Sequence, residues 1–146
     1  VVLAFAARYH DLYRSWPPAE LPELLGAVGE AVDEFERAAP ILLHGRAAAA
    51  RLAANEAGSL GDHQLFSEVL DAVRYHTTGA PAMSPLAEAL LVADQVDKKW
   101  PNPAAVPQDR HEAVRATLAR KLAKLAAREK PVHPRMLAAA AHYGVT

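Results

Sequence analysis

The chain reads Arg74-Tyr75-His76-Thr77-Thr78-Gly79 near its middle, followed by Asp94 in Val92-Ala93-Asp94-Gln95. Two earlier segments carry the same kinds of side chain, a His10-Asp11 doublet and His44 in Leu42-Leu43-His44-Gly45. Imidazole and carboxylate ligands together suit iron, manganese, cobalt or zinc, and a set with two carboxylates and no thiolate disfavours structural zinc. Three histidines and two aspartates on four segments therefore predict a metal site between helices.

The bulk composition narrows the class of protein. The 146 residues are enough for one core, and we expect residues 1–146 to form a single domain. Sixteen basic and seventeen acidic residues nearly cancel, which argues against a general electrostatic role on nucleic acid or membrane. The absence of cysteine excludes disulfides and thiolate metal sites. No apolar run approaches the ~20 residues of a transmembrane helix, and 1–7 is too short for a signal peptide, so we expect a cytoplasmic protein.

The hydrophobic pattern predicts an all-α fold. Alanine and leucine dominate, and no segment shows sustained alternation with a period of two residues. Asp62 or Ser59 is expected to cap one helix and Ser84 another, while Gly58 is expected to end the helix before them. The predicted helices run to about residue 13, from 18 or 22, over 40–57, from 59 or 62 to 76, and over 85–97, 107–130 and 134–142.

Local geometry limits how the candidate ligands can meet. His10 and Asp11 are adjacent, so on an ideal helix their side chains would point ~100° apart. Binding one metal together would require a helix end or a local distortion. His76 is expected at a helix C-terminus, where the negative end of the helix dipole favours a cation. Asp94 lies in an apolar helical segment, where an aspartate is costly unless it is paired or metal-bound.

Each candidate also has an ordinary explanation when taken alone. A His-Asp dipeptide arises by chance, His44 could be a capping or core histidine, and Asp94 could face solvent. The long basic helix near residues 110–130 is most simply a solvated face, because acidic residues elsewhere cancel its charge. The case for a functional site therefore depends on the joint order of the motifs.

Read as a set with Met83-Ser84, the motifs resemble the YqeK family of HD-domain proteins, and Val132-His133-Pro134-Arg135 resembles that family's tail more weakly. The resemblance implies an all-α HD-domain helical bundle that holds a transition metal, iron first, with manganese or cobalt as alternatives. The implied activity is symmetrical cleavage of diadenosine tetraphosphate to two ADP. The implied partner is this dinucleoside polyphosphate, with no nucleic acid and no membrane, and a homodimer is left open.

The resemblance also assigns roles by position. Asp11, His44 and His76 are the implied catalytic residues, and Arg14 stands where the family usually has lysine. His133 and Arg135 match a tail that closes over the nucleotide. The implied metal ligands are His10, Asp11 and Asp94, with His44 and His76 for a second metal, and the implied substrate-binding residues are Arg14, His44, His76, Thr77, Lys98, His133 and Arg135.

Two departures from the family pattern bear on activity. Family members carry a further ligand histidine upstream, whereas only nine residues precede His10 here, and Val1-Val2-Leu3-Ala4-Phe5 looks like the middle of a helix. We therefore expect either an N-terminal helix that is cut short or a protein that lacks this ligand. The family's Glu-Pro-x-Arg is replaced by Asp97-Lys98-Lys99-Trp100, so Lys98 or Lys99 is the expected substitute. Two alternatives stay open, an HD phosphohydrolase for another nucleotide and a degenerate nucleotide-binding module without turnover.

Overall fold

The computed structural model of the protein describes residues 1–99 and 102–145, and the side chains of residues 97–99 lie outside that description. No strand occurs within these residues, so the predicted all-α fold is confirmed. The helices are α1 (Val2–Tyr9), α2 (Leu21–Ala27), α3 (Glu34–Ala38), α4 (His44–Asn55), α5 (His63–Tyr75), α6 (Pro85–Lys99), α7 (Arg110–Ala127) and α8 (Pro134–His142), with 3₁₀ turns at Pro18–Glu20, Pro40–Leu43 and Pro103–Ala105.

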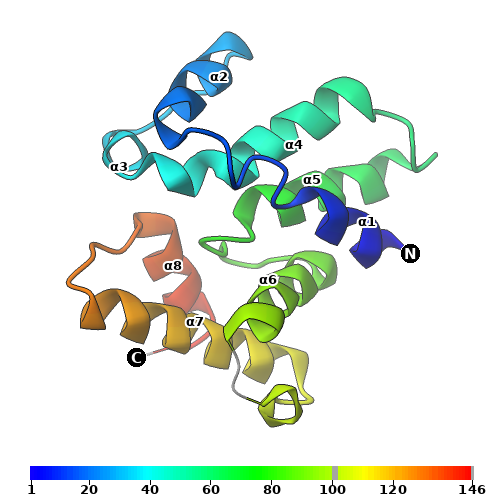
Figure 1. The fold of residues 1–146 in the computed structure, drawn as a ribbon. Helices are drawn as coiled ribbons and strands as arrows, with labels where there is room; N and C mark the ends of the chain where they lie inside the picture. The colour runs from blue at the N-terminus through cyan, green and yellow to red at the C-terminus, as the bar shows by residue number, and fades with distance from the viewer. Residues whose placement is uncertain (100–101, 146) are drawn as a thin grey trace.

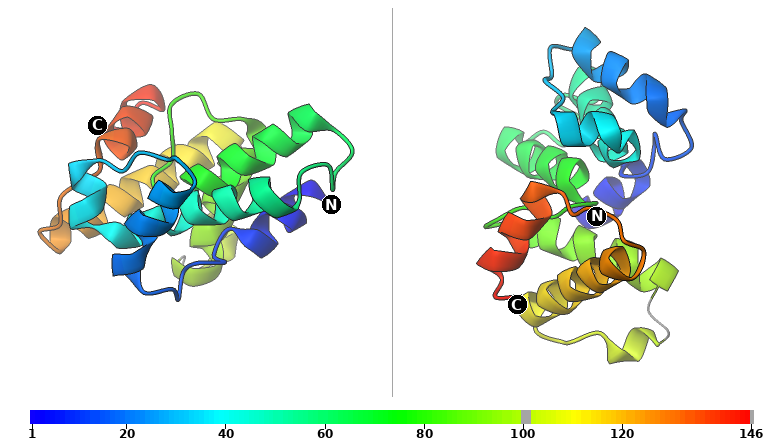
Figure 2. Two further views of the ribbon diagram at one scale, coloured as in Figure 1. Left: turned by 90° about the horizontal axis from the view of Figure 1, so that it is seen from above. Right: turned by 90° about the vertical axis from the view of Figure 1, so that its left-hand side faces the viewer.

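The longer helices pack in chain order. Helix α4 packs on α5, α5 on α6, and α6 on α7, while α2 covers α4 and α8 covers α7 (Figure 1). Helix α1 lies against both α5 and α6. The right-hand view of Figure 2 shows the same succession, with α2 at one end of the molecule and α7 toward the other. This packing brings together the four segments that carry the candidate ligands.

Three apolar clusters hold the helices in place. One joins α1, α4, α5 and α6, a second joins α6, α7 and α8, and a third joins α2 and α4. The fully buried members of these clusters include Ala6, Leu52, Val69, Val73 and Leu90 in the first cluster, Leu91, Val114 and Leu118 in the second, and Leu21, Leu25 and Leu43 in the third.

None of the helices within the described ranges combines the length and apolarity needed to cross a membrane.

Two of the predicted caps are confirmed. The Asp62 carboxylate accepts a hydrogen bond from the Leu65 backbone N–H at 3.1 Å, which starts α5. The Ser84 hydroxyl accepts one from the Ala87 N–H at 3.2 Å, which starts α6. The prediction for Gly58 was wrong, because α4 ends three residues earlier and Gly58 lies in the following turn with φ +91°.

Other helix boundaries also differ from those predicted from the sequence. Helix α1 ends at Tyr9 instead of residue 13, and α7 spans 110–127 instead of 107–130 because Asp109 caps it. The segment from Pro40 begins as a 3₁₀ turn, and α4 proper starts at His44. Short helix α3 was not predicted. It starts with a capping box in which Asp33 and Glu36 bond each other's backbone N–H groups.

A buried carboxylate ties α6 to α7 and to the end of α8. Glu88 is 2% exposed, and its Oε1 accepts a hydrogen bond from the Tyr143 hydroxyl at 2.8 Å and lies 3.2 Å from His111 Nε2. Its Oε2 accepts a hydrogen bond from Arg110 Nε. Both oxygens therefore have donors, as a buried charge requires.

Candidate metal centre

His10 and Asp11 lie where α1 ends. His10 is the C-cap of α1, and its Nδ1 lies 2.6 Å from the Ala7 carbonyl oxygen. The chain then turns, and Asp11 Oδ2 comes to 3.5 Å from His10 Nε2. The helix end thus brings two adjacent side chains to one point, which a continuing helix would not allow.

His44 and His76 face each other where α4 begins and α5 ends. Both rings are buried, and the two Nε2 atoms are 3.0 Å apart. Gly45 makes this approach possible. A Cβ on Gly45 would lie 2.8 Å from the Val73 carbonyl oxygen and 3.0 Å from the His76 ring. The glycine of the Leu-Leu-His-Gly motif is therefore required by the close crossing of α4 and α5.

The three histidines share one hydrogen-bonding arrangement. The Nδ1 of His44 lies 2.6 Å from the Ile41 carbonyl oxygen, and that of His76 lies 2.7 Å from the Val73 carbonyl oxygen, as His10 Nδ1 does with Ala7. A carbonyl can only accept, so each Nδ1 carries the proton. In the neutral rings, each Nε2 therefore presents a lone pair, the tautomer that a metal ligand needs.

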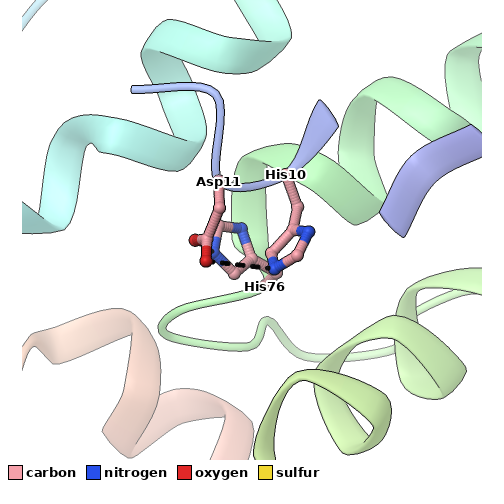
Figure 3. Close-up of side chains that lie close together, drawn as sticks. All are labelled: His10, Asp11 and His76. Atoms are coloured by element: carbon pink, nitrogen blue, oxygen red, sulfur yellow. Dashed lines mark ion pairs between the residues drawn. The ribbon is translucent and has the colours of Figure 1, made fainter. Parts of the chain in front are cut away.

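Asp11 stands between these nitrogens. Its Oδ1 lies 3.4 Å from His44 Nε2 and 3.6 Å from His76 Nε2, while Oδ2 faces His10. Asp94, from the middle of α6, places its Oδ1 3.3 Å from His10 Nε2. Figure 3 shows the side chains of His10, Asp11 and His76 pointing toward one another. These three form one group whose ligand atoms lie within 4.8 Å of one another.

The protonation state of His44 favours ligand chemistry. Burial lowers the pKa of His44 to about 4, with smaller contributions that include the charge of Arg14, so this ring is neutral near pH 7. The pKa of His10 is raised because its Nε2 meets the Asp94 carboxylate, so a metal ion bound there would take the place of a proton on Nε2. When both rings are neutral, the lone pairs of His44 and His76 face each other. The Thr77 hydroxyl oxygen lies 3.4 Å from His44 Nε2 and 3.3 Å from His76 Nε2, and its one proton can serve only one of them. A cation between these nitrogens would remove their repulsion.

The other expected substrate residues lie at different distances from this centre. Arg14 is exposed just after the His10-Asp11 turn. Thr77 lies at the centre, whereas the Thr78 hydroxyl is buried and donates to the Gly79 carbonyl. The side chain of Lys98 lies outside the described residues. The structure places Arg135 over the Tyr75 ring at 4.9 Å and 4.0 Å from Glu36 Oε1.

His133 belongs to a second group with Asp33 and Glu36, which by composition could also hold a metal. Its Nε2 is 3.8 Å from one oxygen of each carboxylate and, within the described part of the chain, has no hydrogen-bond partner. However, its Nδ1 accepts the Arg135 backbone N–H at 3.0 Å, so the neutral ring carries its proton on Nε2. This group therefore presents an N–H to the carboxylates and does not fit a metal ligand. The roles of His133 and Arg135 in substrate binding stay predictions.

Two residues at the centre were not predicted. Gln95 is buried, and its amide N–H donates to Asp94 Oδ2 at 2.8 Å. The Lys121 ammonium, from α7, donates to the Thr77 carbonyl at 2.8 Å. A buried amide beside a ligand aspartate could have been suspected from the dipeptide. Lys121 carried no such signal, because it is 44 residues from Thr77 in the sequence.

Comparison with known proteins establishes the fold. No protein-family model and no curated protein matches the chain. The chain is similar to the crystal structure of a predicted HD superfamily hydrolase involved in NAD metabolism from Clostridium acetobutylicum, with a TM-score of 0.80 and 21% sequence identity. The similarity covers 97% of this chain and 84% of that one. The chain therefore has the all-α fold of that HD superfamily protein.

Proposed function

We propose that this HD-type fold serves a metal-dependent phosphohydrolase that cleaves diadenosine tetraphosphate symmetrically into two ADP. The observation that carries the proposal is the convergence of three imidazole Nε2 atoms and two carboxylates at one point between α1, α4, α5 and α6. The HD superfamily hydrolase of similar fold supports a hydrolytic reaction. The ordered motifs that resemble the YqeK family support the dinucleoside polyphosphate substrate.

The donor set suits iron, with manganese or cobalt as alternatives, since it contains nitrogen and oxygen atoms and no sulfur. His10, Asp11 and Asp94 would hold one ion. His44 and His76 would hold a second, and the two oxygens of Asp11 face different histidines of this set. A bound metal would supply Lewis acidity toward a phosphoryl oxygen and make a water-derived nucleophile available near neutral pH.

The two carboxylates have different access to solvent. The side chain of Asp11 is 28% exposed and that of Asp94 is 7% exposed. Substrate and water can therefore reach Asp11, and we assign it to orient the attacking water toward a phosphorus of the tetraphosphate. Asp94, held by Gln95, is assigned to metal binding alone. Arg14 is assigned to stabilise the charge that develops on the phosphate oxygens, as preorganised donors and cations do. His44 and His76, whose Nδ1–H groups bond backbone carbonyls, would act on the phosphate through a bound metal.

The test pairs elemental analysis of the purified protein with product analysis on diadenosine tetraphosphate. We expect iron or manganese at a stoichiometric level and ADP as the sole product. AMP together with ATP would exclude symmetrical cleavage. Turnover of another nucleotide, without turnover of diadenosine tetraphosphate, would move the chain to a different phosphohydrolase class. Nucleotide binding with no metal and no product would indicate a binding module.

A further inference from the structure

The centre receives a cation from a helix that contributes no predicted ligand. Lys121, in the middle of α7, is half-buried, and its ammonium donates a hydrogen bond to the Thr77 carbonyl at 2.8 Å. The hydroxyl of the same threonine lies 3.4 Å from His44 Nε2 and 3.3 Å from His76 Nε2. The Lys121 ammonium therefore contacts the backbone of the residue whose side chain lies beside the His44 and His76 nitrogens. We infer that Lys121 binds phosphate oxygens of the nucleotide substrate, an inference that rests on the proposed function.

The charges around the centre explain why such a cation is needed. The chain as a whole has a net charge of −1, so its overall field does not attract a polyphosphate. Asp11 and Asp94 add two negative charges at the site itself, and His44 is neutral near pH 7. Beyond the charge of any bound metal ion, a polyphosphate must therefore be met by cations placed locally. Arg14 approaches from the α1 side, and Lys121 approaches from the α7 side.

Lys121 differs from its neighbours on the same helix. Arg120 and Lys124 are exposed, whereas Lys121 is half-buried against the Thr77 turn. A half-buried lysine at the end of α5 also has a structural role, because its charge stabilises the last carbonyls of that helix. The two roles predict different results. A helix-capping lysine contributes to the free energy of unfolding, whereas a phosphate-binding lysine also determines the KM and the affinity for phosphate chains.

The ligand chemistry assigned to Lys121 is the phosphate chain and not the nucleobase. A lysine ammonium acts as a compact point charge with three N–H donors, which suits phosphate oxygens of any nucleotide. The affinity for inorganic tripolyphosphate should therefore depend on Lys121 as the affinity for the nucleotide does. The affinity for adenosine, which has no phosphate, should not depend on Lys121.

The experiment compares Lys121→Met and Lys121→Arg with Lys124→Met, a matched control on the exposed face of α7. In the metal-loaded protein we expect Lys121→Met to raise the KM for diadenosine tetraphosphate about tenfold and to weaken tripolyphosphate inhibition by a similar factor. Lys121→Arg should restore most of both, and Lys124→Met should match the wild type. Metal content should be equal in all four proteins.

Wild-type KM and wild-type tripolyphosphate inhibition in Lys121→Met, together with a lower melting temperature, would overturn the inference and leave a helix-capping lysine. The inference stays testable if the wild type hydrolyses nothing. Calorimetric binding of tripolyphosphate to the wild type, weakened about tenfold in Lys121→Met, would then support phosphate binding without catalysis. No tripolyphosphate binding to the wild type would overturn it.

Discussion

Two buried polar clusters in this molecule look alike by composition and differ in how their atoms are paired. Around Glu88, one carboxylate accepts hydrogen bonds from Arg110 and Tyr143 and lies 3.2 Å from His111 Nε2. Around Asp11, two carboxylates meet three histidines whose N–H groups are already used on backbone carbonyls. In the first cluster, each carboxylate oxygen already accepts a hydrogen bond. In the second cluster, the Nε2 atoms of three histidines converge with two carboxylates on one point.

This difference separates a structural cluster from a ligand site. Burial and the presence of acids and histidines do not distinguish the two. The tautomers do, because a ring whose Nδ1 is engaged by a carbonyl must offer Nε2 as an acceptor. The same test removes the group of Asp33, Glu36 and His133, in which the ring nitrogen that faces the acids carries the proton.

The largest expected effect is on catalysis. Asp11→Asn replaces one of two oxygens that face different histidines and removes the charge, so we expect turnover to fall by at least about 100-fold. Helix content by circular dichroism should stay unchanged, because Asp11 lies after the end of α1. Asp71→Asn, at an exposed position of α5, is the matched control. Full activity in Asp11→Asn would remove Asp11 from the mechanism.

The completed cluster should respond in stability. Glu88→Gln removes the charge that Arg110 and Tyr143 meet, and we expect the free energy of unfolding in urea to fall by about 2 kcal/mol. Metal content should not change. Glu112→Gln, an exposed glutamate on α7, should cause a much smaller loss. If metal were lost in Glu88→Gln, the two clusters would not be independent.

The same cluster predicts a loss of stability in alkali. Burial, and then the hydrogen bond to Glu88, raise the pKa of Tyr143 to about 12 from 10.0. The folded protein keeps this proton at a pH where the unfolded chain has lost it. This contribution is therefore present below pH 10 and is lost between pH 10 and 12, by about 1.5 kcal/mol after allowing for partial exposure. Tyr143→Phe should flatten the pH dependence of urea unfolding in this window, and an unchanged slope would contradict the assignment.

The smallest expected effect concerns Gln95, which lets the centre be adjusted without removing a ligand. Gln95→Leu removes the amide that holds Asp94 Oδ2 and leaves Oδ1 facing His10. We expect metal to bind about tenfold more weakly in chelator competition, as is usual when a partner of a ligand is lost. Gln64→Leu, at an exposed position of α5, should bind metal as the wild type does. Equal affinity in both variants would mean that Asp94 needs no support from Gln95.

Much of the centre could be predicted because its residues stand out locally. Asp94 interrupts an apolar helical segment, and His76 directly precedes a helix-ending Thr-Thr-Gly. The need for a chain turn at His10-Asp11 also followed from helix geometry, and α1 does end at Tyr9. The structure brings His10, Asp11, His44, His76 and Asp94 together as the motifs predicted.

The remaining features depend on packing that a local pattern does not contain. Lys121 reaches Thr77 only because α7 packs on α6 and so passes the end of α5. The close crossing at Gly45 is set by two helices that are distant in the sequence. Short α3 escaped prediction because its five residues are too few for a helical period to repeat, although its Asp33-to-Glu36 capping box could have been recognised.

The carbonyls that orient the three imidazoles belong to Ala7, Ile41 and Val73, each three residues before its histidine. Every amino acid has a carbonyl, so exchanging these side chains leaves the orientation of the rings unchanged as long as the turn persists. The orientation of the three imidazole rings is thus set by the backbone and not by neighbouring side chains. The sequence of this fold can diverge widely, as an identity of 21% to a protein of the same fold illustrates. A designer who wished to transplant the centre would need to copy three turns and one close helix crossing, together with the ligand side chains.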